Sequence, residues 1–192
     1  MACSVPVLLL AFNRPAPTRR VLEQIRRASP ARVYAHCDGP RPQVSADTDK
    51  VTEVRRLIRS ELGENIELYE LFREQNLGLR EGVCDAISWF FRQEEFGIIL
   101  EDDCVPDLSM FQFCAELLLR YKDEPRIMHI GCSNLAEKYT AGLPQSYVFS
   151  RFSFVWGWAS WRRAWHHMLP ELNALEEFER KGQIMHLVSD YM

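Results

Sequence analysis

The sequence lacks a C-x-x-C pair, a G-x-G-x-x-G turn, a Walker A sequence and any apolar run long enough to span a bilayer. Without paired cysteine motifs, we expect reduced, mostly buried thiols rather than disulfides or a zinc site. The absence of a glycine-rich phosphate motif disfavours a dehydrogenase or a P-loop ATPase. The apolar run at residues 5–12 has neither a basic leader nor a cleavage site, so we predict a first strand, no membrane-spanning segment and a cytoplasmic protein.

Basic residues are also slightly fewer than acidic ones. The chain carries 23 Lys and Arg against 27 Asp and Glu, a formal net charge of −4. This balance argues against a nucleic acid or an anionic membrane as the main partner. With 192 residues, of which 47% are hydrophobic, the chain can bury one substantial core, and we predict a single domain over residues 1–192.

Short apolar runs alternate with segments of helical spacing over most of the chain. This alternation predicts an α/β fold with a mostly parallel sheet and helices on both faces. After Gly131 the pattern changes to a predicted strand at 147–154 and helices at 158–168 and 172–187, which we interpret as an appendage. The earlier predicted strands are 5–11, 32–36, 66–72, 97–100 and 127–130, and the helices between them are 17–28, 45–62, 79–91 and 108–121.

Three consecutive carboxylates, Glu101, Asp102 and Asp103, follow the apolar residues Ile98 to Leu100. The apolar run predicts a buried parallel strand, and open α/β sheets bind ligands at the carboxyl ends of their strands. Adjacent carboxylates repel one another, and Mg²⁺ or Mn²⁺ compensates because these cations prefer oxygen ligands. The alternative is a solvated acidic turn that caps the following helix.

Three other predicted strands end in polar residues. Arg14, after the first strand, can bind a nucleotide or phosphate, or lie at the surface. Asp38, after the second, can accept from a base or a ribose hydroxyl, or make a turn. Asn76 and Gly78 suit a tight turn before a helix N-terminus, which favours an anion but also serves as a plain connector. In a parallel sheet all these ends converge with the acidic triplet.

Taken in order, these segments resemble the GT-A nucleotide-diphospho-sugar transferases. The chain looks closest to bacterial-type sugar transferases, some with an old "hemolytic protein" label, that are distantly similar to the N-acetylglucosaminyltransferases initiating complex N-glycan branching. The resemblance covers residues 5–165 and implies a Rossmann-like GT-A fold, with a nucleotide-binding half at 1–131 and the start of an acceptor-side half at 132–192. It is carried by Phe12–Pro15, Asp38–Gly39, Asn76–Gly78, Gly97–Asp103 and Trp156–Trp161.

The resemblance implies a metal-dependent, inverting transfer of a sugar from a nucleotide donor, expected to be a UDP-sugar, to a glycan or other hydroxyl acceptor. It implies Mn²⁺ or Mg²⁺ as the cofactor, with Asp103 as its ligand. It also implies that Arg14 contacts the nucleotide and that Asp38 reads the base. The remaining implied donor contacts are Asn76, Gly78 and Arg80 beside the diphosphate, and Glu101 and Asp102 at the ribose and donor sugar.

Tryptophans are concentrated after residue 155. Aromatic faces suit the C–H-rich faces of sugars, and we expect Trp156, Gly157 and Trp158 to form a donor-sugar or acceptor wall. We assign Trp161 and Trp165 to the core, because their helical spacing is typical of core packing.

A general base for acceptor activation is not evident in the sequence. In the family resembled, this carboxylate follows the tryptophan segment in a Trp-Asp context, which is missing after Trp165. Glu171 and Asp190 are the remaining candidates, and we expect the chain to be an N-terminal part of a longer protein. Two alternatives stay open. One is a non-catalytic nucleotide-sugar or carbohydrate-binding module, and the other is a nucleotidyltransferase, which would normally carry a glycine-rich basic loop after its first strand.

Overall fold

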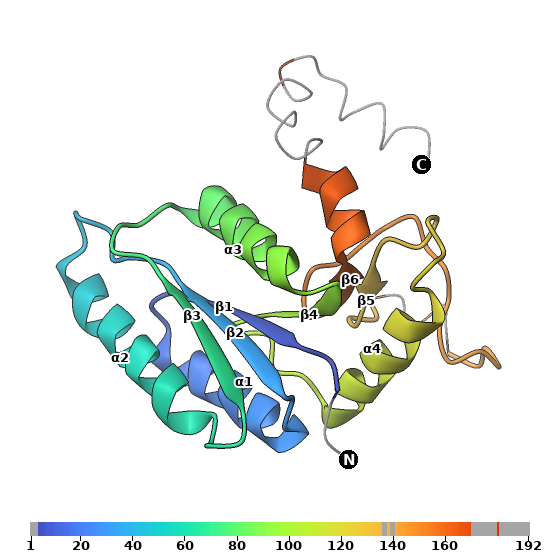
Figure 1. Ribbon diagram of the computed structural model, residues 1–192, viewed down its shortest axis with the longest axis horizontal. Coiled ribbons are helices and arrows are strands. Elements are labelled where there is room, and N and C mark those ends of the chain that lie inside the picture. Colours follow the sequence, from blue (N-terminus) through green and yellow to red (C-terminus); the bar gives the residue numbers. More distant parts are fainter. Residues whose placement is uncertain (1–3, 136–137, 139–140, 170–179, 181–192) are drawn as a thin grey trace.

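The computed structural model describes residues 4–135, 138, 141–169 and 180, and it has the alternating strands and helices that the sequence predicts (Figure 1). Each predicted element of the first half is present within a few residues of its expected bounds. The elements are β1 (Val7–Ala11), α1 (Pro15–Ala28), β2 (Arg32–Cys37), α2 (Ser45–Glu61), β3 (Glu67–Phe72), α3 (Leu79–Gln93), β4 (Phe96–Glu101), α4 (Leu108–Arg120), β5 (Ile130–Gly131) and β6 (Trp158–Trp161).

The strands form one six-stranded mixed sheet with the order β3-β2-β1-β4-β6-β5. The pairs β2–β3, β1–β2 and β1–β4 are parallel, whereas β6 is antiparallel to both β4 and β5. The prediction of an α/β fold with a mostly parallel sheet is therefore confirmed. Because β1 lies between β2 and β4, the carboxyl ends of these three strands lie next to one another.

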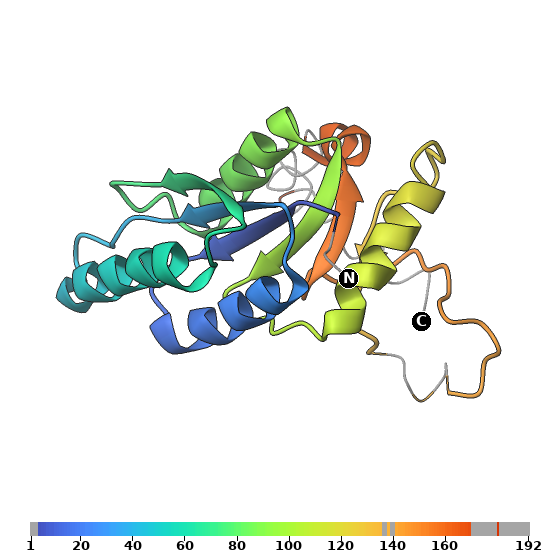
Figure 2. The same cartoon turned by 60° about the horizontal axis from the view of Figure 1, so that its bottom comes forward.

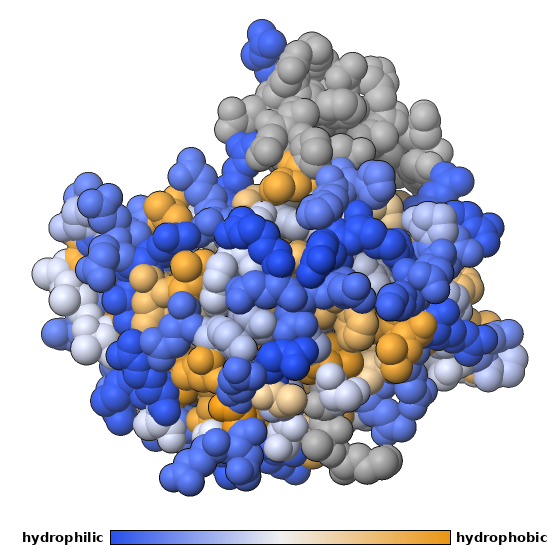
Figure 3. Space-filling view, viewed as in Figure 1, coloured by the Kyte–Doolittle hydropathy of each residue, from blue (hydrophilic) through white to orange (hydrophobic). Residues whose placement is uncertain are grey.

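Helices cover both faces of the sheet, as predicted, and a hydrophobic core lies on each side (Figure 2). Alternate residues of β1 point to opposite faces: Val7 and Leu9 pack with α1, α2 and α4, and Leu8 and Leu10 pack with α3. The helical residues 162–169 add Trp165 to the α3 side. The face seen in Figure 3 is mostly hydrophilic, with apolar residues in separate patches.

The region after Gly131 differs from the prediction. Residues 147–154 form no strand, and the helix predicted from 158 begins only at 162, because Trp158–Trp161 is strand β6. All four residues of β6 are buried, since the strand is covered on both faces, and this hides the alternation that normally identifies a strand. The strand predicted at 127–130 is reduced to β5. Since β6 lies between β4 and β5, the expected boundary at 131 does not separate two sheets.

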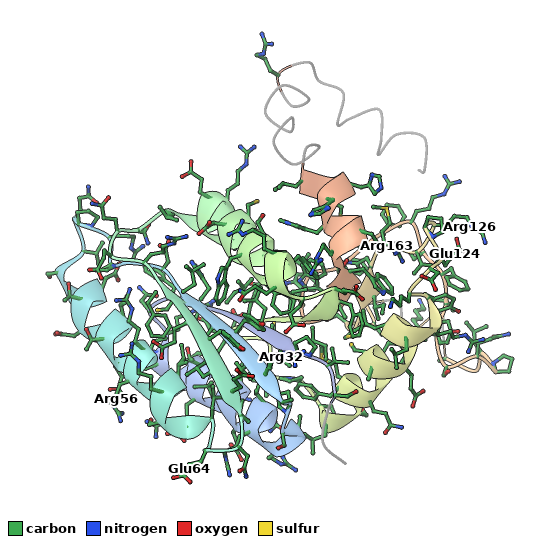
Figure 4. The ribbon with its side chains drawn as sticks, viewed as in Figure 1. Arg32, Arg56, Glu64, Glu124, Arg126 and Arg163 are labelled. Carbon is green, nitrogen blue, oxygen red and sulfur yellow. The ribbon has the colours of Figure 1, made fainter. Side chains whose placement is uncertain are left out.

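Two arginines after β6 tie this strand to the ends of two helices. Arg162 Nε donates to the carbonyl oxygens of Phe91 (2.5 Å) and Glu94 (3.2 Å) at the end of α3. Arg163 donates to three carbonyl oxygens just past α4, in the region where Figure 4 labels it near Glu124 and Arg126. Except for the bond to Ile127, these bonds satisfy carbonyl groups at or directly after a helix end, where intrahelical partners are missing. Both arginines therefore bind backbone groups of neighbouring segments instead of forming a purely solvated helix face.

Among the described residues, no helix combines the length and the apolar character needed to cross a bilayer.

Candidate functional site

The carboxyl ends of β1, β2 and β4 bring the predicted strand-end residues to one edge of the sheet. In the strand register, Leu10 of β1 lies opposite Glu101, and Ala11 lies opposite Cys37. One residue further, the backbone N–H of Phe12 donates to Asp102 Oδ2 at 3.2 Å. The segment after β1 is thereby attached directly to the acidic triplet.

Arg14 bridges the last two carboxylates of the triplet. Its Nη1 donates to Asp103 Oδ2 at 2.7 Å, and its Nη2 pairs with Asp102. The two aspartates differ in exposure, since the side chain of Asp102 is 2% exposed and that of Asp103 is 45% exposed. Burial raises the pKa of Asp102, although the Arg14 charge acts in the opposite direction. Asp102 is therefore held inside the protein, and Asp103 lies where a ligand can reach it.

Glu101 is half-buried beside its two acidic neighbours, and the Arg14 charge opposes their effect only in part. Burial raises its pKa, and the charges of Asp103 and Asp102 raise it further. Within the described part of the chain, its carboxylate receives no hydrogen bond. A positive charge placed beside Glu101 and Asp103 would lower the electrostatic energy of this strand end.

Asp38 holds the predicted tight turn in place. Its carboxylate accepts from the backbone N–H groups of Gly39 (2.8 Å), Leu77 (3.0 Å) and Gly78 (3.2 Å), and from Asn76 Nδ2 (3.1 Å). The turn itself needs Gly78, which has φ 79° and precedes the first residue of α3. The turn-forming alternative for Asp38 is therefore present in the structure, and base recognition by the same carboxylate stays a prediction.

Gly39 allows this turn to approach the end of β2. A Cβ atom at this position would lie 2.4 Å from the backbone carbon of Gln75, a distance that forces the turn to move. Asp38 and Gly39 thus both position the 76–78 turn: the Asp38 carboxylate binds the turn, and Gly39 leaves room for the turn backbone.

Asp47 was not anticipated from the sequence. It lies in the first turn of α2, is 1% exposed, and accepts from Asn13 Nδ2 and Arg41 Nε, each at 2.6 Å. The Arg41 hydrogen bond holds the pKa of Asp47 well below its usual range. Arg41 in turn lies over the Phe12 ring, 5.4 Å from its centroid. In the sequence Asp47 looks like an ordinary acidic residue of a helix start, because its partner Asn13 is 34 positions away.

His36 is a second buried group that the sequence did not identify. It points from β2 toward the first turn of α3, where a Cβ on Gly82 would lie 3.6 Å from its Cε1. Its Nε2 has no hydrogen-bond partner within the described residues. Burial lowers the pKa of His36, against the influence of Asp38 and Asp85.

A cavity of about 1470 Å³ adjoins the exposed side of the triplet. Glu101 and Asp103 contribute to its lining, together with the first turns of α4 and parts of residues 126–157. Trp156 and Gly157 also line it, and the Trp156 side chain is 53% exposed. Arg14, Asp38, Asn76 and Gly78 lie outside this lining, on the neighbouring strand ends.

Trp158 does not belong to the predicted sugar wall. It is 5% exposed and stacks on His129 with the ring centroids 4.9 Å apart. Its position in β6 directs the ring into the core on the α3 side, so no open face remains for a sugar. Trp161 and Trp165 are buried, which confirms their assignment to the core.

Arg80, Glu171 and Asp190 are the remaining residues that the sequence predicted for the site. Arg80 is exposed on the first turn of α3. Glu171 and Asp190, the candidate bases, lie outside the described residues, as does the helix predicted at 172–187 apart from residue 180. The described residues contain no group of three or more His, Cys, Asp or Glu side chains placed to hold a metal ion by themselves.

Comparison with protein-family models gave no match, and comparison with curated proteins gave none either.

Proposed function

We propose that this chain binds a nucleoside-diphosphate sugar together with Mn²⁺ or Mg²⁺, and that it is a GT-A-type glycosyltransferase acting on a hydroxyl acceptor. One observation carries the proposal: an arginine, a turn at a helix N-terminus and a partly uncompensated acidic triplet meet at adjacent strand ends, beside a cavity with an exposed tryptophan. In open α/β sheets this edge is the place where ligands bind.

The donor set fits a hard divalent cation. Glu101 and Asp103 offer carboxylate oxygens on the side of the cavity. The pKa of Glu101 is raised by burial first and by the charges of Asp103 and Asp102 second, and a cation would offset this second contribution. Mg²⁺ and Mn²⁺ are commonly bound through one or two carboxylates plus substrate phosphates, so a closed protein cage is not required. When bound, such an ion would neutralise charge on the nucleoside diphosphate as it leaves.

Arg14 and Asp102 have different tasks in this proposal. Asp102 is buried and fixes both the Phe12 backbone and the Arg14 guanidinium, so it acts as a positioning residue. Arg14 is half-exposed and supplies charge-assisted donors to the diphosphate. Arg14 Nη1 pairs with Asp103, and it would become available to a phosphate oxygen if Asp103 held a cation.

The Asn76–Gly78 turn and the N-terminus of α3 would form the opposite side of the nucleotide site. The N-terminal N–H groups of a helix favour an anion or an acceptor edge. Asp38 already accepts hydrogen bonds from four protein donors, so a base N–H would share an oxygen that is in use. In this proposal the main role of Asp38 is to hold the turn that forms the base site, and its contact with the base is secondary.

The proposal is tested by incubating the protein with a panel of UDP-sugars and Mn²⁺, and measuring release of UDP with and without a hydroxyl acceptor. We expect Mn²⁺-dependent release that Asp103→Ala removes. Asp107→Ala is the matched control: Asp107 lines the same cavity, but its carboxylate accepts from Ser109 N at 2.8 Å as the N-cap of α4.

The two alternatives give different outcomes. Binding of a UDP-sugar without release of UDP would favour a non-catalytic binding module. Exchange of pyrophosphate with a nucleoside triphosphate would favour a nucleotidyltransferase. Either result would overturn the glycosyltransferase proposal.

A further inference from the structure

Two cysteines face each other between α4 and the end of β5. The Sγ atoms of Cys114 and Cys132 are 3.3 Å apart, although the residues are separated by 18 positions. Neither cysteine forms a disulfide in the structure. Cys114 is fully buried on the inner side of α4, whereas Cys132 is half-buried and lines the large cavity.

We propose that Cys114 and Cys132 form a redox-sensitive dithiol, which a peroxide converts to a disulfide that joins α4 to β5. The cavity gives a small oxidant access to Cys132, and Cys114 lies behind it as the second thiol. The inference rests on this geometry and is independent of the proposed sugar-transfer activity.

The chemistry balances with hydrogen peroxide as the oxidant. The Cys132 sulfur attacks one peroxide oxygen, the O–O bond breaks, and one water leaves as a sulfenic acid forms. The Cys114 sulfur then attacks the Cys132 sulfur, the S–O bond breaks, and a second water leaves. Two thiols are oxidised by two electrons in total, and one peroxide is reduced to two waters.

The geometry requires only a small movement. A disulfide has an S–S distance of about 2.05 Å, so the two sulfurs must approach by roughly 1.3 Å from their present contact. Cys132 immediately follows β5, which is only two residues long, so a side-chain rotation with a small backbone shift can supply this approach. Cys114 is held on α4 and serves as the fixed partner.

The disulfide would stiffen one wall of the cavity. The backbone N–H of Cys132 donates to the carbonyl oxygen of Gly157 at 3.1 Å, and Ser133 Oγ donates to the carbonyl oxygen of Trp156 at 2.6 Å. The segment that carries the exposed Trp156 is therefore attached to the residues beside Cys132. Crosslinking Cys132 to α4 would limit the movement of this segment.

The test treats the reduced 192-residue protein with hydrogen peroxide, then denatures it and alkylates the remaining thiols. We expect two of the six cysteines to escape alkylation, a mass loss of two hydrogens, and a crosslinked peptide pair containing Cys114 and Cys132. The midpoint of thermal unfolding should rise by about 5 °C on oxidation and return with dithiothreitol.

Single cysteine substitutions test which two thiols form the crosslink. Cys132→Ser and Cys114→Ser should each abolish the crosslink, and Cys104→Ser should keep it, although Cys104 lines the same cavity. If Cys114→Ser fails to fold because its site is buried, the loss or retention of the crosslink in Cys132→Ser tests the proposal. Oxidation that stops at a sulfenic or sulfinic acid, or a disulfide that maps to any other pair, would overturn the proposal.

Discussion

Two neighbouring regions of this protein use polar and aromatic side chains in opposite ways. At the strand-end network, made of Asp38, Asp47 and Asp102, every carboxylate is buried and accepts several hydrogen bonds from the protein. Along the cavity wall, Phe149 and Trp156 are 68% and 53% exposed. The first region determines the geometry of the loops, and the second is the surface that a ligand can reach.

The acidic triplet contains this contrast within three residues. Asp102 points into the network, where it meets Arg14 and the Phe12 backbone, while Glu101 and Asp103 line the cavity. Asp102 and Asp103 lie in a turn that follows β4 and is closed by a hydrogen bond from Cys104 N–H to the Glu101 carbonyl oxygen at 3.1 Å, and this turn lets one triplet serve both regions. Composition alone does not tell a structural carboxylate from a ligand-binding one; the difference comes from the partners already bound.

The largest expected difference in the free energy of unfolding is between two tryptophan substitutions. Trp158→Ala should lower the free energy of unfolding by about 4 kcal/mol, because it removes a buried aromatic ring from the core. Trp156→Ala should change it by less than about 0.5 kcal/mol, because this ring is largely exposed. Urea unfolding of both variants measures the difference. Equal destabilisation by the two substitutions would contradict the separation of core from cavity wall.

Asp38 provides the next largest effect. Asp38→Ala should lower the free energy of unfolding by about 3 kcal/mol, because several buried donors of the 76–78 turn lose their acceptor. Asn76→Ala removes one of these donors and should cost about 1 kcal/mol, which makes it a graded control. Chemical denaturation without ligand measures both. An Asp38→Ala protein as stable as wild type would show that the turn does not depend on this carboxylate.

The two aspartates of the triplet should contribute unequally to the free energy of unfolding. Asp102→Asn should cost about 2 kcal/mol of stability, because a buried acceptor of two hydrogen bonds is altered. Asp103→Ala should cost less than about 1 kcal/mol, since its pair with Arg14 is partly exposed. Unfolding curves for the two variants, recorded without metal, test this order. A larger stability loss for Asp103→Ala would place that residue in the network instead.

The sequence predicted the strand ends well, because each is marked by a polar residue that follows a short apolar run. It failed at β6, where Trp158, Trp161 and Trp165 have helical spacing. Residues 158–161 form a strand because they pair with β4 and β5. It also missed Asp47, because a buried carboxylate is recognisable only when its distant partners Asn13 and Arg41 are known to converge on it. These errors share one cause: tertiary contacts decide the outcome where the local pattern fits two structures.

The smallest expected effect concerns pH. Burial lowers the pKa of His36 and of His129, so the unfolded chain binds protons more readily at these positions. The stability that the neutral imidazoles provide is present above about pH 6.5 and is lost as the pH falls below this value. Thermal unfolding between pH 7.5 and 5 should therefore show a smaller loss of stability for His36→Gln than for wild type. A parallel pH profile for the two proteins would contradict this assignment.

Calorimetric titration with UDP tests whether the ends of β1, β2 and β4 form a metal-dependent nucleotide site. We expect wild-type protein to bind UDP in Mn²⁺ and to bind ADP more weakly. Chelation or Asp103→Ala should weaken UDP binding at least about tenfold, a loss of roughly 1.4 kcal/mol or more. Asp107→Ala should bind like wild type. Absence of UDP binding in Mn²⁺, or equal binding after chelation, would contradict the account.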